Sequence, residues 1–367
     1  MIIGIPKETK IHEYRVSMTP DAVADLCAHG HVCYVQQSAG VAAGFSDRDY
    51  QQAGAHIATT REEVFLLAQL IVKVKEPHKE EIALLRPEHI LFTFLHLAAV
   101  PDIAALLLAS GCTAIAYETV TDDKGRLPLL MPMSMVAGRM AIQAAARCLE
   151  QEYGGKGLLM SGIRDVPAAK VIIIGAGTVG RNAAMVAIGM GADVIVIDKQ
   201  AASLQAIKKE YGERIETVLY SPENLMTYLA QADVIVGAAL QAGKRAPKIL
   251  TRQHLKTLQH GTVLVDVSID QGGCFESSRP TTHADPSYIE EGIVHYCVTN
   301  MPGAVPRTST MALSQTTLPY ILRLANKGVA DAMNDKYGLV DGINIHAGKI
   351  YHEAVASALQ QVKTKGA

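Results

Sequence analysis

The sequence predicts an α/β protein with two doubly wound domains, one of them a Rossmann dinucleotide-binding domain inserted into a discontinuous substrate domain. Short apolar runs alternate with helical patterns along the chain, which is typical of parallel sheets. A glycine-rich turn follows one of these runs in mid-chain, and a long helical pattern at 310–327 returns the chain to its first part. We therefore expect the substrate domain at residues 1–128 and 306–367 and the nucleotide domain at residues 129–305.

The elements of the first domain are marked by apolar runs and by helix-capping patterns. Thr19-Pro20-Asp21 and Ser46 are typical helix starts, and Gly30 and Gly54 are typical helix ends. We expect strands at 2–5, 32–35, 70–74, 90–94 and 113–116, and helices that begin near residues 20, 47, 79 and 101.

A turn-rich break at 121–125 separates this region from the next. A long helix of small residues at 134–150 is expected to link the domains. The nucleotide sheet is then predicted from apolar runs at 171–174, 194–197, 234–236, 263–267 and 295–298.

The glycine turn predicts the cofactor. Gly175, Gly177 and Gly180 form G-x-G-x-x-G between an apolar strand and a helix. The first glycine permits a tight turn, the second lets the backbone approach a pyrophosphate, and the third lets the helix pack closely on the strand. The phosphates would lie at the start of this helix. Asp198 ends the next strand, 18 residues beyond Gly180, where a carboxylate can accept hydrogen bonds from both ribose hydroxyls. The spacing favours NAD over NADP, and the alternative is a glycine turn without a ligand.

Composition restricts the class of protein. The chain has 367 residues, enough for two domains, and a net charge of -2 from 34 basic and 36 acidic residues. No basic run suggests a nucleic-acid or lipid surface, so we expect small-molecule partners.

The amino terminus lacks the form of a signal peptide, and the most apolar stretch, 82–116, is broken by charges, which predicts a cytoplasmic protein without a membrane span. The six cysteines form no C-x-x-C pair, so we expect reduced packing residues and no metal site.

Polar residues just beyond predicted strand ends are the candidates for chemistry, because ligands of open α/β sheets bind at the carboxyl ends of the strands. Lys75 and His96 follow neighbouring strands of the first domain, and Asp270 follows a strand of the nucleotide domain. Arg15, in the loop after the first strand, offers a fork of donors that suits a carboxylate. We expect a cleft between the domains to bring these four residues together.

Each candidate also has a structural interpretation. Arg15 could be a solvated or salt-bridged residue, and Lys75 could pair with Glu76 or Glu80. His96 lies between two leucines, as a core or helix-capping histidine does, and Asp270 could cap a turn. For Asp266, inside its strand, a structural hydrogen bond is the favoured use.

Several segments together resemble the L-alanine dehydrogenase family from the first residues to about residue 325. The segments are Gly4-Ile-Pro-Lys-Glu8, Arg15-Val-Ser-Met-Thr-Pro20, Val74-Lys-Glu-Pro77, His96-Leu-Ala98, the glycine turn, Asp266 with Asp270-Gln-Gly-Gly-Cys-Phe-Glu-Ser-Ser-Arg-Pro-Thr-Thr282, and Asn300-Met-Pro-Gly-Ala-Val-Pro-Arg-Thr-Ser-Thr310.

The resemblance implies a role for each candidate. Arg15 and Lys75 match residues that hold the substrate carboxylate and carbonyl oxygen, and His96 and Asp270 match the catalytic acid/base pair. The serine of the adenine region falls at Ser221. Further cofactor contacts carry over to Ser134, Thr178, Val179, Asp198, Ala239, Leu240, Val267, Ser268, Ile269, Asp270, Arg279, Val298, Thr299, Asn300 and Met301.

The implied reaction is the reversible NAD-dependent oxidative deamination of L-alanine to pyruvate and ammonium by a homo-hexamer. Removal of a hydride leaves an imine that water attacks, so a group titrating near neutrality is needed first as a base and then as an acid. His96 suits this work, and no metal is required. The alternatives are the nucleotide-binding subunit of a transhydrogenase, an opine dehydrogenase, and a non-catalytic NAD-binding regulator.

Overall fold

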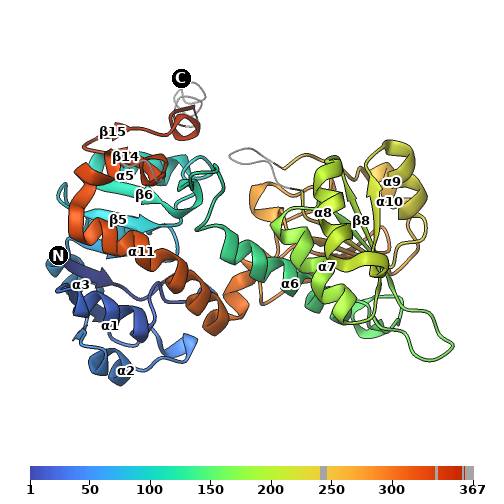
Figure 1. The fold of residues 1–367 in the computed structure, drawn as a ribbon, viewed down its shortest axis with the longest axis horizontal. Coiled ribbons are helices and arrows are strands. Elements are labelled where there is room, and N and C mark those ends of the chain that lie inside the picture. The colour runs from blue at the N-terminus through green and yellow to red at the C-terminus, as the bar shows by residue number, and fades with distance from the viewer. Residues whose placement is uncertain (240–245, 335–337, 358, 360–367) are drawn as a thin grey trace. The chain divides into compact units, whose positions relative to one another are not determined.

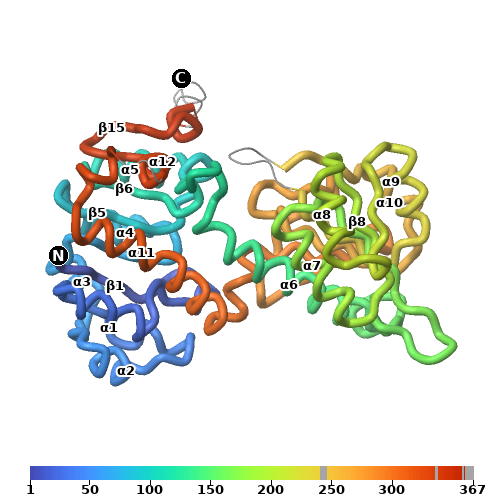
Figure 2. Tube along the Cα trace, viewed as in Figure 1, coloured from blue at the N-terminus to red at the C-terminus, as the bar shows by residue number. Residues whose placement is uncertain are grey.

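The computed structural model describes residues 1–239, 246–334, 338–357 and 359, and the chain divides into two compact units. Unit 1 comprises Met1–Met133 and Gly303–Ala367, and unit 2 comprises Ser134–Pro302. Figure 1 shows their elements in chain order, and Figure 2 lets the path of the chain be followed from one unit to the other and back. Each unit has its own sheet, which confirms the predicted α/β class with one doubly wound domain inserted into another.

Unit 1 is built on an eight-stranded sheet in the order β15-β14-β6-β5-β4-β1-β2-β3. The strands from β6 to β3 are parallel, whereas β14 and β15 add an antiparallel edge. The chain runs from β1 outward on one side and returns to β4 on the other, so the switch point lies between these two strands. The strands are β1 Ile2–Ile5, β2 Val32–Gln36, β3 His56–Ala58, β4 Leu70–Val72, β5 Ile90–Thr93, β6 Thr113–Ala116, β14 Ile343–His346 and β15 Lys349–Ile350.

The helices of unit 1 begin where the sequence supplies caps. Thr19 and Ser46 accept hydrogen bonds from the first turns of α1 and α2, as predicted. The long helix α11, orange in Figure 1, lies against α1. The helices are α1 Pro20–Ala28, α2 Asp47–Gln52, α3 Arg61–Leu67, α4 Lys79–Ile82, α5 Pro101–Ser110, α11 Pro306–Met333 and α12 Leu339–Gly342.

Unit 2 is built on a seven-stranded sheet in the order β12-β13-β11-β10-β7-β8-β9. All its strands are parallel except β12, and the switch point between β7 and β10 is that of a Rossmann fold. The strands are β7 Lys170–Ile174, β8 Asp193–Asp198, β9 Glu216–Leu219, β10 Val234–Gly237, β11 Val263–Asp266, β12 Ser287–Glu290 and β13 Ile293–Tyr296. The helices are α6 Met131–Cys148, α7 Thr178–Gly189, α8 Ala201–Tyr211, α9 Pro222–Leu229 and α10 Arg252–Leu255.

Both faces of this sheet are buried. Val171 and Ile173 of β7 pack into one apolar cluster, whereas Ile172 and Ile174 pack into another. Such double burial explains why the strands read as continuous apolar runs rather than as alternating ones.

Some element bounds differ from the prediction. The strand expected at 70–74 ends at Val72, because the Val74 backbone N–H donates to the Glu8 carboxylate at 2.6 Å. The strand expected at 295–298 is β13, which begins at Ile293 and ends at Tyr296, and Val298 instead forms an isolated bridge with Thr281. The return helix begins at Pro306, a residue favoured at the first helical position, rather than at Thr310.

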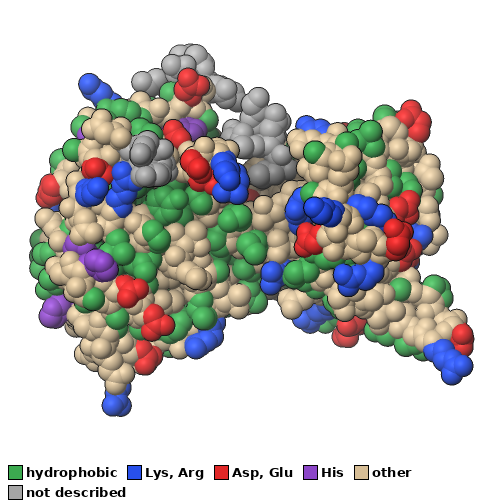
Figure 3. Space-filling view, in the orientation of Figure 1, with side chains coloured by type: hydrophobic (Ala, Val, Ile, Leu, Met, Phe, Trp, Pro, Cys, Tyr) green, Lys and Arg blue, Asp and Glu red, His purple; other side chains and the backbone are tan. Residues whose placement is uncertain are grey.

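On the face drawn in Figure 3, basic and acidic side chains are intermixed. Among the described residues, no helix is long and apolar enough to cross a membrane. All six cysteines are free thiols, and five of them are buried.

Candidate functional site

Four loops of unit 1 leave the carboxyl ends of the neighbouring strands β1, β4, β5 and β6. Three of them carry the candidates Arg15, Lys75 and His96. Hydrogen bonds join each loop to the next: Glu8 after β1 accepts from the Lys75 backbone N–H at 3.4 Å, and the Thr93 hydroxyl of β5 donates to the Lys75 carbonyl at 3.0 Å. Glu118 after β6 accepts from the His96 backbone N–H at 2.6 Å. The three candidates of unit 1 therefore belong to one connected edge of its sheet.

Arg15 is buried and forms an ion pair. Its side chain is 2% exposed, and its Nε and Nη2 donate to the two carboxylate oxygens of Glu13, the first at 2.6 Å. Its Nη1 donates to the Met133 thioether at 3.1 Å. One edge of the guanidinium, formed by Nε and Nη2, is thus occupied by the carboxylate of a neighbouring residue.

The chain around Arg15 is fixed by helix α11. The Val16 backbone N–H donates to the Thr310 hydroxyl at 3.2 Å, and the Thr19 backbone N–H donates to the Ser314 hydroxyl at 3.0 Å. Both hydroxyl residues are fully buried. The segment of unit 1 after the inserted unit therefore helps to position the loop that carries Arg15.

The loop that carries Lys75 is supported by a buried charge cluster. Lys73 is 1% exposed and forms ion pairs with Glu8 at 3.2 Å and with Glu81 at 2.9 Å. Burial disfavours the ammonium, but the two carboxylates outweigh this effect and raise the pKa of Lys73. Burial raises the pKa of Glu8, although Lys73 opposes the shift. This cluster fixes the backbone on which Lys75 is placed.

Lys75 is partly exposed. Glu76, its expected structural partner, pairs with Lys10 instead. Within the described parts of the chain, the Lys75 ammonium forms no ion pair.

His96 is at the surface of the edge rather than in the core. Its side chain is 44% exposed, its Nδ1 lies 3.9 Å from the Glu118 carboxylate, and its ring stacks on Phe94 at a centroid distance of 5.9 Å. Its backbone is left-handed, with a φ of 48°. An exposed imidazole beside a carboxylate can exchange protons with a bound molecule, which the core-histidine interpretation does not allow.

In unit 2, the glycine turn has the geometry that a dinucleotide requires. Gly175 has a φ of 116°, and a Cβ there would lie 2.6 Å from the Ala238 carbonyl oxygen. A Cβ at Gly180 would lie 1.8 Å from the Gly175 carbonyl oxygen, so helix α7 can approach the turn only with glycine. At Gly177 a Cβ would meet no described atom within 4 Å. The turn therefore faces open space at the start of α7, where Thr178 and Val179 begin the helix without a side-chain cap.

Asp198 lies at the end of β8 beside this turn. Its carboxylate accepts from the Ala176 backbone N–H at 2.6 Å and from the Gln200 backbone N–H at 2.7 Å. Ser221 follows the next strand, and its hydroxyl caps α9 through the Asn224 backbone N–H at 3.1 Å. Asp198 ends its strand as predicted, whereas Ser221 follows β9, a strand that the sequence analysis did not predict.

The loop that carries Asp270 is closed by Asp266. This buried carboxylate accepts from the backbone N–H groups of Ser268 and Cys274, at 3.1 and 2.9 Å, and from the Ser278 hydroxyl at 2.6 Å. Burial raises the pKa of Asp266, and these hydrogen bonds oppose the shift. Asp266 thus has the structural role predicted for it, while Asp270 is exposed in a 3-10 turn, Ile269–Gln271.

Several of the other expected nucleotide contacts follow strand ends of unit 2. The Ser268 hydroxyl donates to the Ala239 carbonyl at 2.8 Å, and the Val267 backbone N–H donates to Gly237. The Arg279 guanidinium lies over the Tyr288 ring at 3.8 Å. Leu240 lies outside the described residues. Of the remaining contacts, Ser134 is in α6, and Val298, Thr299, Asn300 and Met301 follow β13.

The structure places the candidates in two groups. Arg15, Lys75 and His96 belong to unit 1, whereas Asp270 and the nucleotide contacts belong to unit 2. The expected cleft between the domains stays a prediction. Sequence reasoning missed Glu13, Glu8 and Glu118, although a lysine inside the apolar run at 70–74 was a signal that a buried carboxylate must lie nearby.

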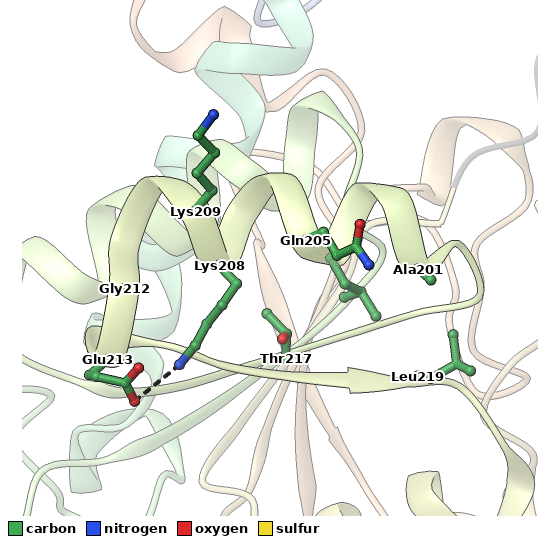
Figure 4. Close-up of a pocket in the computed structure, with 9 residues that line it drawn as sticks. Ala201, Gln205, Lys208, Lys209, Gly212, Glu213, Thr217 and Leu219 are labelled. Carbon is green, nitrogen blue, oxygen red and sulfur yellow. Dashed lines mark hydrogen bonds and ion pairs between the residues drawn. The ribbon is translucent and has the colours of Figure 1, made fainter.

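A separate pocket of about 490 Å³ lies between α8 and the edge strand β9 of unit 2. Figure 4 shows Lys208 paired with Glu213 at one end, with Thr217 and Leu219 of the strand beneath the helix. None of the candidate residues lines this pocket. Within the described residues, no group of three or more histidine, cysteine or acidic side chains could hold a metal ion.

Models of two protein domains match the chain. Residues 4–137 match the alanine dehydrogenase/PNT N-terminal domain, and residues 141–353 match the C-terminal domain of the same family. Among solved structures, an L-alanine dehydrogenase is similar with a TM-score of 0.95 and 42% identity, covering 99% of this chain and 100% of the other. A transhydrogenase from Sinorhizobium meliloti has a TM-score of 0.81 at 22% identity, over 96% of this chain and 100% of that one, and shows the fold alone.

Relatives extend over nearly the whole length. The alanine dehydrogenase of Halomonas elongata is 50% identical over 98% of this chain and 96% of its own, and that of Bacillus subtilis is 47% identical over 98% and 95%. Together with the two domain matches, this similarity shows that the chain belongs to the alanine dehydrogenase/PNT family.

Proposed function

We propose that this protein is an alanine dehydrogenase that uses NAD to convert L-alanine reversibly to pyruvate and ammonium. The observation that carries the proposal is its similarity, at 44–50% identity over 98% of the chain, to relatives named alanine dehydrogenase. The likeness to a transhydrogenase, at 22% identity, does not favour the alternative activity.

The family and the Rossmann fold of unit 2 imply a nicotinamide dinucleotide cofactor, which accepts a hydride from C2 of the amino acid. NAD is favoured because the Asp198 carboxylate suits two ribose hydroxyls and repels a 2′-phosphate. Gly177 and the first turn of α7 offer backbone N–H groups to the pyrophosphate. The contacts at Ser134, Ser221, Ala239, Leu240, Arg279 and residues 267–270 and 298–301 belong to the same proposal.

Residues of unit 1 bind and process the substrate in this proposal, which makes residues 1–128 and 306–367 the substrate domain. Lys75 and Arg15 bind the carboxylate and the carbonyl oxygen. His96 accepts a proton as water adds to the imine and returns one as ammonium leaves. Asp270, from unit 2, orients the water or the amine.

Purified protein tests the reaction directly. NADH oxidation should require both pyruvate and ammonium, and NAD reduction should require L-alanine. A membrane-free sample that oxidises NADH with pyruvate alone, or with neither compound, would contradict the proposal.

The choice of cofactor has its own test. The value of kcat/KM should favour NAD over NADP at least tenfold, and Asp198→Ala should narrow this ratio because the repulsion of the 2′-phosphate is lost. Comparable values for the two cofactors in the unaltered protein would sink this part of the proposal.

The resemblance extends the proposal to the assembly and the compartment. We propose a homo-hexamer that acts in the cytoplasm, where NAD is supplied and where the free thiols stay reduced.

A further inference from the structure

Arg15 is already paired with a carboxylate of its own unit. The Glu13 carboxylate accepts from three donors of Arg15: the backbone N–H at 3.1 Å, Nε at 2.6 Å, and Nη2. The side chains of Arg15 and Glu13 are 2% and 1% exposed. A planar guanidinium fork held on a carboxylate in this way is fixed in orientation as well as in charge.

The backbone also holds Glu13 in place. Its N–H donates to the Lys10 carbonyl at 3.0 Å, and Val16, on the other side of Arg15, is hydrogen-bonded to Thr310 of α11. These backbone contacts fix the part of the loop from which the Glu13 carboxylate reaches the Nε and Nη2 edge. A substrate carboxylate must approach a different edge of Arg15, such as that of Nη1, whose contact with the Met133 thioether is a weak hydrogen bond.

The charge of Glu13 has a second effect. A fixed negative charge opposes a bound dianion about twice as strongly as a bound monoanion. Among the other carboxylates of this edge, Glu8 and Glu81 pair with Lys73, Glu76 pairs with Lys10, and Glu118 accepts from the backbone N–H groups of Leu95 and His96. Glu13 is thus the carboxylate that acts on the proposed anion site through Arg15.

We propose that Glu13 is a positioning residue for Arg15 and that its charge selects monocarboxylate over dicarboxylate substrates. The inference rests on the proposed function, in which Arg15 binds the substrate carboxylate. It assigns to Glu13 both the orientation of the guanidinium and the rejection of a second negative charge on the substrate.

The test compares pyruvate with 2-oxomalonate, which has a second carboxylate where pyruvate has a methyl group. NADH oxidation with ammonium is measured for the full chain and for Glu13→Gln. We expect the KM for pyruvate to rise about tenfold, and the ratio of kcat/KM for 2-oxomalonate to that for pyruvate to rise about tenfold. An unchanged ratio would overturn the selective role.

Glu13→Asp separates charge from position, because it keeps the carboxylate and shortens its reach. We expect a raised KM for pyruvate with the substrate ratio within twofold of the unaltered protein. An unchanged KM would overturn the positioning role, and a ratio that rises as in Glu13→Gln would show that charge is not the cause. Glu13→Asp also decides the question if Glu13→Gln fails to fold.

Two controls keep the inference separate from the proposed function. Glu62→Gln removes an exposed carboxylate that pairs with Arg61, and it should change neither KM nor the ratio. NADH binding, measured by fluorescence titration, should be equal in all variants. If the unaltered protein does not turn over pyruvate with ammonium, the proposed function fails. The inference is then judged by the rise in unfolding temperature that pyruvate and 2-oxomalonate each cause. If the unaltered protein and Glu13→Gln prefer pyruvate over 2-oxomalonate to the same extent, the inference is overturned.

Discussion

His96 combines an exposed imidazole with a backbone held by Glu118. Replacing it with alanine should lower kcat at least about 100-fold, because proton transfer to and from the substrate is lost while no proposed cofactor contact changes. Steady-state kinetics with pyruvate and ammonium measure this effect, and fluorescence titration measures NADH affinity, which should stay the same.

A matched control is available in the same unit. His29 is an exposed histidine at the end of α1, where its Nδ1 lies 2.8 Å from the Asp25 carbonyl oxygen. His29→Ala should leave kcat unchanged. Near-normal turnover in His96→Ala would remove the histidine from the proposed mechanism.

The residues that support the site were harder to predict than the candidates themselves. Lys75 and His96 could be located because they follow apolar strands, and parallel strands end at the same edge of a sheet. Glu8, Glu13 and Glu118 gave no such signal, because their roles depend on the neighbours that tertiary folding provides. The ion pair between Arg15 and Glu13 depends on a bend of the loop that carries them, and hydrophobic periodicity in the sequence does not predict such a bend.

At the scale of single elements, the turn after β4 depends on the Lys73 cluster. Lys73→Met should lower the free energy of unfolding by about 3–5 kcal/mol, because Glu8 and Glu81 would remain buried without their cation. Urea denaturation measures the loss. The comparison is Lys10→Met, which removes the ion pair between Lys10 and Glu76. Because the Lys10 side chain is 30% exposed, this change should lower the free energy of unfolding by less than about 1 kcal/mol. Equal losses in the two variants would contradict a special role for the buried cluster.

A buried histidine in strand β13, His295, should make the stability of the protein depend on pH. His295 is fully buried, its Nε2 lies 2.7 Å from the Ser277 hydroxyl, and burial lowers its pKa. The unfolded chain then binds more protons than the folded chain as the pH falls below about 6.5, so the free energy of unfolding decreases there. One such group contributes at most about 1.4 kcal/mol per pH unit.

This contribution can be isolated by substitution. Urea denaturation between pH 7 and pH 5 should give a shallower pH slope for His295→Gln than for the unaltered protein. His89 should retain part of the slope, because burial lowers its pKa as well. An unchanged slope would show that His295 binds protons equally in the folded and the unfolded chain.

Elements with strong local signals were predicted well, and edge elements were not. The strands Ile2–Ile5 and Thr113–Ala116 have the predicted bounds, and the helix Pro101–Ser110 begins where predicted, because apolar runs and Pro101 mark them. The short strands β3, β9, β12, β14 and β15 were missed. They have two to four residues each, and β14 is paired with β6 from a distant part of the chain, so local sequence carries little of their information.

For the whole molecule, the proposed homo-hexamer can be tested by mass. Light scattering on a size-exclusion column should give about six times the chain mass of 39.3 kDa. The resemblance to the family supports this number, since composition alone does not indicate an assembly. A mass of one or two chains under the conditions of full activity would contradict the hexamer.

The left-handed backbone of His96 restricts how this position can change during evolution. Glycine, asparagine and aspartate tolerate a φ of 48° better than most residues, and none of them has a side chain that titrates near neutrality. Residues that tolerate the left-handed backbone thus lose the proposed proton transfer. Lysine or tyrosine would supply a proton donor, but they would strain the backbone at this position. Position 96 therefore has no neutral path to another acid/base group, and a descendant that lost this histidine would be expected to keep the fold while giving up the reaction.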